Sequence, residues 1–374
     1  MRVFVPRELS PGETRAAIVP ATVARLAKLG LQLEVESAIG AQIFQSDDLY
    51  RQAGASISSD RTASLAAADM VLRLRTLPPD EVPSLKPGSI HISFLDPFND
   101  LPLVRQLAAR GVSALSMQMI PRSTVAQKMD ALSSQANLAG YISVIIAAEQ
   151  LGKILPMMTT PAGTIRPAKV FVIGVGVAGL QAIATAKRLG AQIEAFDTRP
   201  VVEEQVRSLG ARFVKADLGE TGQTAQGYAK ELTPGQLAKQ RDVMAQHCAP
   251  SDIVITTAQV FGRQAPRILT ADMVRSMAPG SVVVDLAVET GGNVEGSRPD
   301  QDVQLNGVKI IGISNMPRRV ARTASEMYSS NLGNLIEHFW DKQAATFPLD
   351  LNHDLIKGFL LTHAGEIIHP QFKQ

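Results

Sequence analysis

The sequence predicts an α/β protein with two Rossmann-like, doubly wound domains joined by a long helix. Short β-rich runs alternate with helical stretches along almost all of the 374 residues, a pattern typical of parallel sheets. A chain of this length also favours two domains over one. The full glycine fingerprint of a nucleotide-binding turn occurs in the second half of the chain, and the first half has none.

The first domain is predicted from strand-like runs, each bounded by Gly, Pro or Asp. These runs lie at 3–5, 31–35, 70–74, 89–95 and 113–117, and a helix-like stretch occupies 21–28. Alternation of this kind indicates a doubly wound sheet covered by helices.

A long helix rich in Ala, Leu, Ser and Gln is predicted over 130–154, where it can bridge two domains. The second α/β domain begins at Lys169, and its predicted strands are 170–173, 192–196, 212–215, 253–256, 282–285 and 308–312. The pattern is helical again from 321. Because the second domain already has its full set of strands, this tail is expected to fold back on the first. The predicted domains are therefore 1–133 with 321–374, and 134–320.

Composition narrows the function classes. The formal net charge of +2 indicates neither a nucleic-acid partner nor an anionic membrane surface. Cys248 is the only cysteine, and the six histidines show no metal-ligand spacing, so neither an internal disulfide nor a metal site is predicted. No targeting segment is recognised. The most apolar helical stretch, 141–155, contains Glu149 and Lys153 and falls short of the ~20 apolar residues of a membrane span. A cytoplasmic protein without direct membrane insertion is expected.

The strongest motif is a G-x-G-x-x-G pattern that follows a buried strand and opens a helix. The first glycine permits a tight turn, the second lets the backbone approach a pyrophosphate, and the third lets the helix pack closely on the strand. The pyrophosphate is expected at the helix N-terminus, where free N–H groups and the helix dipole favour an anion. The predicted cofactor-contacting residues of this turn are Gly174, Val175, Gly176, Val177 and Gly179.

Asp197 ends the next strand, at the offset of about 20 residues where an acid binds the adenosine ribose. A carboxylate there accepts from ribose hydroxyls and repels a 2′-phosphate, so it selects NAD(H) over NADP(H). Arg199 is the opposing signal, because an arginine can accommodate that phosphate. We predict that NAD(H) binds in the cleft between the domains, with Asp197, Thr198 and Arg199 at its adenosine end. The alternative is a glycine-rich turn that holds no ligand.

Two classes of NAD(H) enzyme fit such a site. A dehydrogenase that acts on an alcohol or amino acid moves a proton as well as a hydride, and therefore needs a positioned acid or base. An enzyme that passes hydride from one nicotinamide to another moves no proton in the chemical step. It needs only alignment of the two rings.

Several segments together carry a specific pattern: Pro6-Arg7-Glu8 with Arg15, and the stretches 129–141, 156–158, 175–190 and 285–293. Over nearly the whole chain, they resemble the soluble NAD(H)-binding component (the alpha-1 subunit, or domain I) of proton-translocating NAD(P) transhydrogenase. The resemblance implies reversible, Re/Si-specific hydride transfer between NADH and NADP⁺ bound on a partner subunit, coupled to proton translocation. It also implies a homodimer and, through membrane-spanning partners, a peripheral position at the inner face of the membrane.

Alanine dehydrogenase, a sister family with the same fold, is the alternative. In that family a lysine within a strand and a histidine after a later strand perform acid–base work. Arg75 and Asp96 stand at the corresponding positions here, and an arginine does not exchange protons at neutral pH. His91 lies in an apolar run and is interpreted as a strand residue. Arg15 is present, but without these partners it has no keto-acid chemistry to serve.

In place of an acid and a base, the transhydrogenase family has a loop with Arg, Gln and Asp in order, and residues 121–130 supply all three. By resemblance, Arg122 and Asp130 orient the nicotinamide end of NADH, Ser133 lies close by, and Gln127 reaches toward the partner's NADP(H). The competing interpretation is a helix cap, because Asp130 precedes the long helix. A third hypothesis, a non-catalytic NAD(H) sensor, leaves this loop unexplained.

Two further segments complete the predicted site. The polar stretch 218–240 is interpreted either as a surface loop or as a mobile flap, and by resemblance its Gly227 and Tyr228 cover the bound nucleotide near the adenosine. Thr257, Ala258 and Gln259 resemble the wall of the nicotinamide pocket. The glycine cluster at 291–296 precedes no helix and is interpreted as a loop, and nothing is assigned to residues 77–99.

Overall fold

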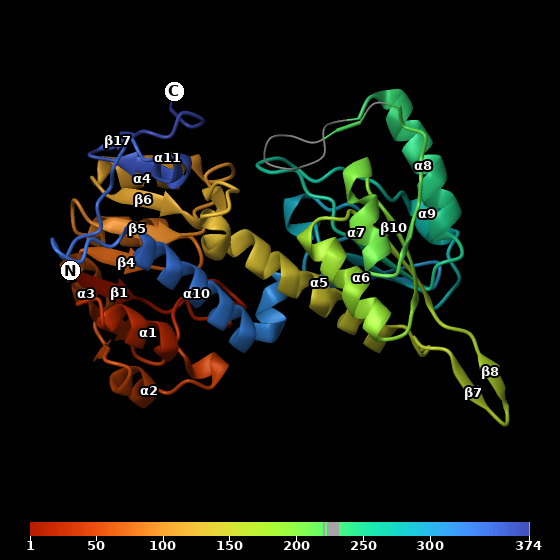
Figure 1. The fold of residues 1–374 in the computed structure, drawn as a ribbon, viewed down its shortest axis with the longest axis horizontal. Coiled ribbons are helices and arrows are strands. Elements are labelled where there is room, and N and C mark those ends of the chain that lie inside the picture. Colours follow the sequence, from red (N-terminus) through yellow and green to blue (C-terminus); the bar gives the residue numbers. More distant parts are fainter. Residues whose placement is uncertain (220, 223–231, 374) are drawn as a thin grey trace. The chain divides into compact units, whose positions relative to one another are not determined.

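The computed structural model describes residues 1–219, 221–222 and 232–373. The chain divides into two compact units, Met1–Gln135 with Val320–Gln374 (unit 1) and Ala136–Arg319 (unit 2). Each unit is an α/β layer structure built on one largely parallel sheet (Figure 1), which confirms the predicted fold class.

Unit 1 contains an eight-stranded sheet in the order β17-β16-β6-β5-β4-β1-β2-β3. The six strands from β3 to β6 run parallel, whereas β16 is antiparallel to β6 and β17 is antiparallel to β16. The strands are β1 (Arg2–Val5), β2 (Gln32–Glu36), β3 (Ser56–Ser58), β4 (Met70–Leu72), β5 (Ile90–Ser93), β6 (Ser113–Ser116), β16 (Leu360–His363) and β17 (Glu366–Ile367). The helices are α1 (Pro20–Ala27), α2 (Asp47–Gln52), α3 (Arg61–Ala67), α4 (Leu101–Ala109), α10 (Ala321–Phe339) and α11 (Asp354–Phe359).

The C-terminal segment, Val320–Gln374, forms part of unit 1. Two serines of α10 accept hydrogen bonds from the backbone that leads into α1: Ser325 from the N–H of Ala16 at 2.9 Å, and Ser329 from that of Val19 at 3.0 Å. The tail then adds β16 and β17 to the edge of the sheet. The sequence pattern predicted neither strand, because runs of two to four residues carry too little alternation to be recognised.

Unit 2 contains a seven-stranded sheet in the order β11-β10-β9-β12-β13-β15-β14, and only β14 is antiparallel. The strands are β9 (Lys169–Ile173), β10 (Gln192–Phe196), β11 (Arg212–Phe213), β12 (Ile253–Thr256), β13 (Val282–Asp285), β14 (Gln301–Leu305) and β15 (Val308–Gly312). The helices are α6 (Val177–Arg188), α7 (Glu203–Ser208), α8 (Pro234–Cys248) and α9 (Ala271–Arg275). The strand order reverses between β9 and β12, and ligands of doubly wound sheets bind at this switch point.

Helix α5 (Ala131–Gln150) begins in unit 1 and continues into unit 2. It is long and apolar enough to span a membrane, by length and composition alone. This corrects the expectation drawn from residues 141–155: the helix begins at Ala131, so its apolar part precedes Glu149 and Lys153. A Cβ at Gly140 would lie 2.1 Å from the carbonyl oxygen of Ala178, so α5 packs directly on the start of α6. Core helices satisfy the same length and composition criterion.

A separate hairpin, β7 (Met158–Thr160) with β8 (Gly163–Ile165), projects from the sheet of unit 2 (Figure 1). All six of its strand residues are exposed, and they form a two-stranded sheet of their own. The sequence pattern predicted neither strand, because isolated three-residue strands leave no readable period.

Candidate functional site

The three glycines after β9 have three different structural roles. Gly174 has a φ of +93°, and a Cβ there would lie 2.7 Å from Thr257 Oγ1, so both the backbone conformation and the lack of space require glycine at this position. A Cβ at Gly179 would lie 2.0 Å from the carbonyl oxygen of Gly174, which shows how closely α6 packs on the turn. At Gly176, by contrast, a Cβ would meet nothing within 4 Å. The space in front of this residue is open, at the N-terminus of α6, which has no acidic residue in its first turn.

Asp197 lies at the carboxyl end of β10, beside this turn, and its carboxylate is fully bonded. Oδ2 accepts from the N–H of Val175 at 2.7 Å and from Arg199 Nη2 at 2.7 Å. Oδ1 accepts from the backbone N–H of Arg199 at 2.9 Å and from its Nε at 2.8 Å. These bonds use about the four acceptor positions that a carboxylate offers. The hydrogen bond to Asp197 raises the pKa of the Arg199 guanidinium.

The segment after β12 borders the same turn. The N–H of Thr257 donates to the carbonyl oxygen of Ile173, and its Oγ1 donates to that of Gly174 at 2.9 Å. Gln259 Nε2 donates to the carbonyl oxygen of Leu286 at 3.2 Å. On the opposite side, the carbonyl oxygen of Thr198 accepts from Thr221 Oγ1 at 2.6 Å. The structure thus brings the glycine turn, the 197–199 segment and the 257–259 segment together at the switch point of one sheet.

Two residues of this region, Asp285 and Asn293, were not predicted from the sequence, and both have 0% exposure. The Asp285 carboxylate accepts from the backbone N–H groups of Ala287, Asn293 and Val294. The Asn293 side chain bonds both backbone groups of Ala258. Residues 291–296 are therefore a loop, as interpreted, but one that is built around a buried carboxylate. The available signal was the polar pair itself, at the end of a buried strand and in the loop that follows it.

In unit 1 the structure places the predicted loop residues around the start of α5. Asp130 Oδ1 accepts from the N–H of Ser133 at 2.9 Å, and Oδ2 accepts from its Oγ at 2.6 Å, so Asp130 is a helix cap in this structure. Gln127 belongs to a 3₁₀ turn (Ala126–Met129) and is exposed, as is Arg122. Buried Met129 anchors the turn. Gly227 and Tyr228 lie outside the described residues.

The positions expected to matter for alanine dehydrogenase chemistry have other partners. Arg15 forms a two-point ion pair with Glu13, through bonds of 2.8 and 2.6 Å, and also donates to Gln135. Asp96 accepts from Asn99 at 3.0 Å. His91 lies in β5, as interpreted from the sequence, and its Nε2 lies 3.0 Å from Ser93 Oγ. Burial, together with the nearby Arg73, lowers the pKa of His91 to about 3, which keeps the ring neutral at physiological pH.

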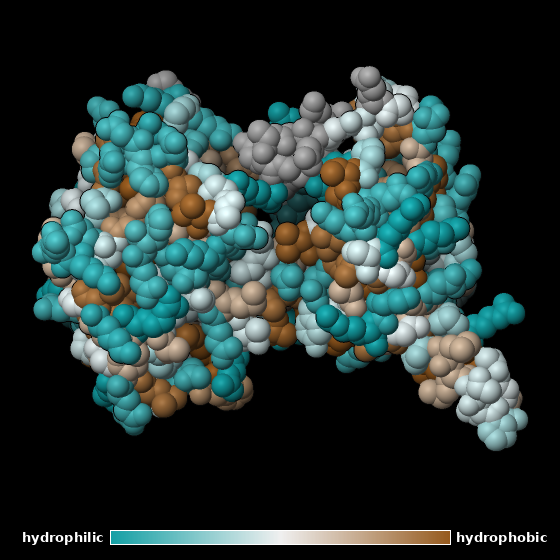
Figure 2. Space-filling model, in the orientation of Figure 1, coloured by the Kyte–Doolittle hydropathy of each residue, from teal (hydrophilic) through white to brown (hydrophobic). Residues whose placement is uncertain are grey.

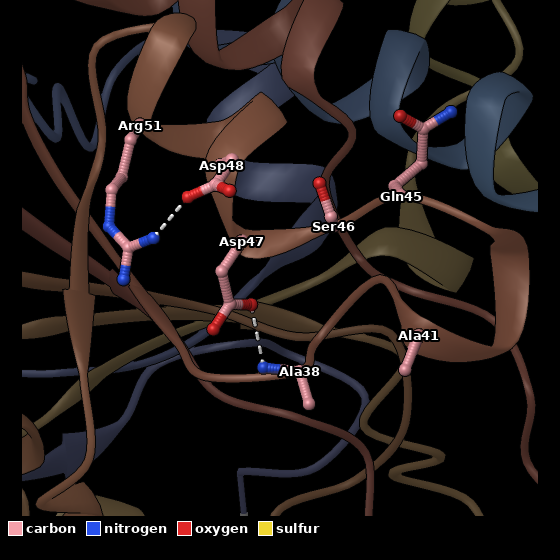
Figure 3. Close-up of a pocket in the computed structure, with 7 residues that line it drawn as sticks. All are labelled: Ala38, Ala41, Gln45, Ser46, Asp47, Asp48 and Arg51. Atoms are coloured by element: carbon pink, nitrogen blue, oxygen red, sulfur yellow. Dashed lines mark hydrogen bonds and ion pairs between the residues drawn. The ribbon is translucent and has the colours of Figure 1, made fainter.

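A surface hollow of about 360 Å³ lies elsewhere in unit 1, beside the N-terminus of α2 (Figure 3). Asp47 accepts there from the N–H of Ala38 at 2.8 Å, and Asp48 pairs with Arg51 at 2.5 Å. The hollow is lined by Ala38, Ala41, Gln45, Ser46, Asp47, Asp48 and Arg51, and it contains none of the predicted site residues. Across the part of the chain that the structure describes, no group of three or more His, Cys, Asp or Glu side chains could hold a metal ion.

Comparison with known proteins relates these features to a family. Residues 4–139 match the model of the alanine dehydrogenase/PNT N-terminal domain, and residues 143–370 match that of the C-terminal domain. The chain is 43% identical over 377 residues to a Rhodospirillum rubrum protein named as the first part of the NAD(P) transhydrogenase alpha subunit, covering 99% of this chain and 98% of that one. It is 40% identical to "NAD(P) transhydrogenase subunit alpha" of Cereibacter sphaeroides, covering 99% of this chain and 71% of the relative.

A solved transhydrogenase structure from Sinorhizobium meliloti superposes with a TM-score of 0.88 at 41% identity, over 98% of this chain and all of that chain. Similarity to "Alanine dehydrogenase 2" of Staphylococcus aureus is lower, at 28% identity over 87% of this chain and 83% of the relative. The chain therefore belongs to the alanine dehydrogenase/PNT family, and within it to the NAD(P) transhydrogenase alpha subunits.

Proposed function

We propose that this chain binds NAD(H), and that the bound NADH transfers a hydride reversibly to NADP⁺ held by a partner subunit. The observation that carries the nucleotide proposal is the open space at Gly176, at the N-terminus of a 12-residue helix on the switch point of a doubly wound sheet. Asp197 supports NAD(H) over NADP(H), because its carboxylate follows the strand next to the glycine turn, where we expect the adenosine, and it binds Arg199, a nearby group suited to a 2′-phosphate.

The proposed chemistry is direct transfer between two nicotinamide rings, without local proton exchange. We assign Arg122, Gln127, Asp130 and Ser133 to orienting the nicotinamide end. A guanidinium, an amide, a carboxylate and a hydroxyl can fix position, but none suits proton exchange at pH 7. For such a step, the rate acceleration comes from holding the two nicotinamide rings aligned at near-attack distance. We further propose that Gly227 and Tyr228 cover the adenosine and that Thr257, Ala258 and Gln259 face the nicotinamide.

Partner subunits are the second element of the proposal. The Rhodospirillum relative is named as the first part of an alpha subunit, and a name of this kind supports further subunits in the same enzyme. We propose that NADP(H)-binding and membrane-spanning partner subunits supply the other components. Through them the chain would sit at the inner face of the membrane, and proton translocation would drive transfer from NADH to NADP⁺.

Reconstitution tests this function. The purified chain should bind NADH with no turnover, because the acceptor ring is absent. Addition of the purified NADP(H)-binding component should start hydride transfer from NADH to NADP⁺, measured by single-turnover absorbance with an NADH analogue whose spectrum differs from that of NADPH. The same preparation is assayed with L-alanine and NAD⁺. Oxidation of L-alanine by the chain alone would establish the alanine dehydrogenase alternative, and silence in every mixture would leave only the NAD(H)-sensor hypothesis.

Gln127→Asn provides the matched variant for that assay. It keeps the amide and removes one methylene, so transfer should slow by on the order of tenfold or more while NADH affinity changes by less than about twofold. Gln127 is exposed, so stability should not change. Equal losses of transfer and of binding would assign Gln127 to ground-state binding alone.

We also propose a homodimer that uses the β7–β8 hairpin. Met158 and Ile165 are paired across it and are each 45% exposed, and Met157 beside them is 67% exposed. Figure 2 shows tan to brown residues at the base of this projection. Apolar side chains on a two-stranded sheet with free edges are costly unless another surface covers them, and an isologous contact between two copies does so.

Met158→Asp combined with Ile165→Asp should convert a wild-type dimer to a monomer, as measured by sedimentation velocity. The melting temperature of the monomer fold should not fall, because both side chains are exposed on the hairpin. Leu351→Asp, at a residue 42% exposed in unit 1, is the control and should leave the dimer intact. A monomeric wild type, or a double variant that remains dimeric, contradicts the proposal.

A further inference from the structure

We infer that Asn293 is a positioning residue for the nicotinamide half of the bound nucleotide, acting through the backbone of Ala258. The inference rests on the proposed NAD(H) function and deepens it, because it assigns to a fully buried amide the placement of a segment that would contact the nucleotide. The contacts that carry it all lie within unit 2.

The Asn293 side chain forms hydrogen bonds with both the N–H and the carbonyl oxygen of Ala258, as a neighbouring β-strand would. Its Oδ1 accepts from the N–H of Ala258 at 3.0 Å, and its Nδ2 donates to the carbonyl oxygen of Ala258 at 2.8 Å. Nδ2 also donates to the carbonyl oxygen of Pro266 at 2.8 Å. Only a side chain with both an acceptor and two donors can make this set, so neither aspartate nor leucine, which are close to asparagine in size, can replace it.

The amide is itself held rigidly. The backbone N–H of Asn293 donates to Asp285 Oδ1 at 3.2 Å, and its carbonyl oxygen accepts from the N–H groups of Ile268 and Leu269. Asp285 has no exposure, and among the described residues it is stabilised by N–H and hydroxyl donors rather than by a cation. Gly292 allows the loop backbone to lie close to the Asp285 carboxylate, because its φ is +79° and a Cβ there would lie 2.7 Å from Asp285 Oδ2.

Ala258 needs such support because it lies beyond the sheet. The ladder of β12 ends at Thr256, and residues 257–260 have no regular secondary structure. At Ala258, the side-chain amide of Asn293 therefore makes the backbone hydrogen bonds that the sheet no longer supplies. An unsupported backbone at this position would be free to move, and placement errors of about 1 Å at a reacting group can cost on the order of 100-fold in rate.

The strand order shows which half of the nucleotide meets this segment. The pyrophosphate site lies in front of Gly176 after β9, and the adenosine end is at Asp197 after β10, which neighbours β9 on one side. β12 neighbours β9 on the other side, so a dinucleotide extended across the switch point passes its nicotinamide ribose and ring over the end of β12. Ala258 stands there, and Asn293 lies behind it.

The test compares NADH with ADP, which contains the adenosine and the pyrophosphate but lacks the nicotinamide half. Asn293→Asp keeps the size of the side chain, removes both donors and places a charge beside Asp285. Asn293→Ser removes the amide pair without adding charge. We expect both variants to bind NADH at least tenfold more weakly and ADP within twofold of wild type, by calorimetry. In the reconstituted assay at saturating NADH, transfer should also slow by tenfold or more.

Asn306→Asp is the matched control, since Asn306 is an exposed asparagine whose side chain donates to the carbonyl oxygen of Arg275. Its NADH and ADP affinities should stay unchanged. Thermal unfolding of each variant shows whether unit 2 remains folded, and Asn293→Ser decides the question if Asn293→Asp does not fold. Parallel losses of NADH and ADP binding, or unchanged NADH binding, would overturn the inference. Failure of the wild type to bind NADH would instead refute the proposed function.

Discussion

Gly176→Ala should weaken NADH binding by on the order of 100-fold, about 2.8 kcal/mol, while unit 2 stays folded. The φ of Gly176 is −86° and its ψ is −163°, a conformation that alanine adopts without strain. A Cβ would meet no protein atom within 4 Å, so the native fold has room for it. The same Cβ would occupy the space that a pyrophosphate needs in order to reach the N-terminus of α6. Calorimetry with NADH and thermal unfolding measure the two effects separately.

Gly179→Ala is the contrasting control. Its Cβ would lie 2.0 Å from a backbone carbonyl oxygen that cannot move without displacing the turn, so unit 2 should lose stability and NADH binding together. The pair thus separates a glycine required by the ligand from one required by the fold. NADH binding that survives Gly176→Ala would show that the nucleotide does not approach this turn.

Asp197→Asn should shift the nucleotide preference toward NADPH by on the order of 100-fold in the ratio of the two dissociation constants, again about 2.8 kcal/mol. The substitution removes the charge that repels a 2′-phosphate. It also releases Arg199 from two charge-assisted bonds of 2.8 and 2.7 Å, so the guanidinium can bind that phosphate. NADH should bind more weakly and NADPH more tightly, as measured by fluorescence titration of both nucleotides.

Arg199→Ala in the Asp197→Asn background tests whether Arg199 is the source of the increased NADPH affinity. If Arg199 binds the 2′-phosphate, the double variant loses the increased NADPH affinity and keeps the weakened NADH affinity. An unchanged NADH-to-NADPH ratio in Asp197→Asn would mean that another residue discriminates between the two nucleotides.

Local features of this protein were readable from its sequence. Gly174, Gly176 and Gly179 follow a strand that is buried on both faces, and each spacing is short enough for neighbouring residues to decide the conformation. Asp197 was predicted for the same reason, because it follows the next parallel strand of a β-α-β unit. Three central strands of unit 2, Lys169–Ile173, Ile253–Thr256 and Val282–Asp285, were predicted by their apolar runs.

Only the tertiary structure decided which distant groups meet. Asn293 contacts Ala258 across 35 residues of sequence, and Thr362 Oγ1 accepts from the N–H of Ala114 across 248. Strands such as β16 and β17 form because a sheet edge is already present to pair with, and their own residues show no period. Local pattern depends on neighbours in the chain, whereas a buried amide or an edge strand depends on neighbours in space, which the folded sheet alone brings together.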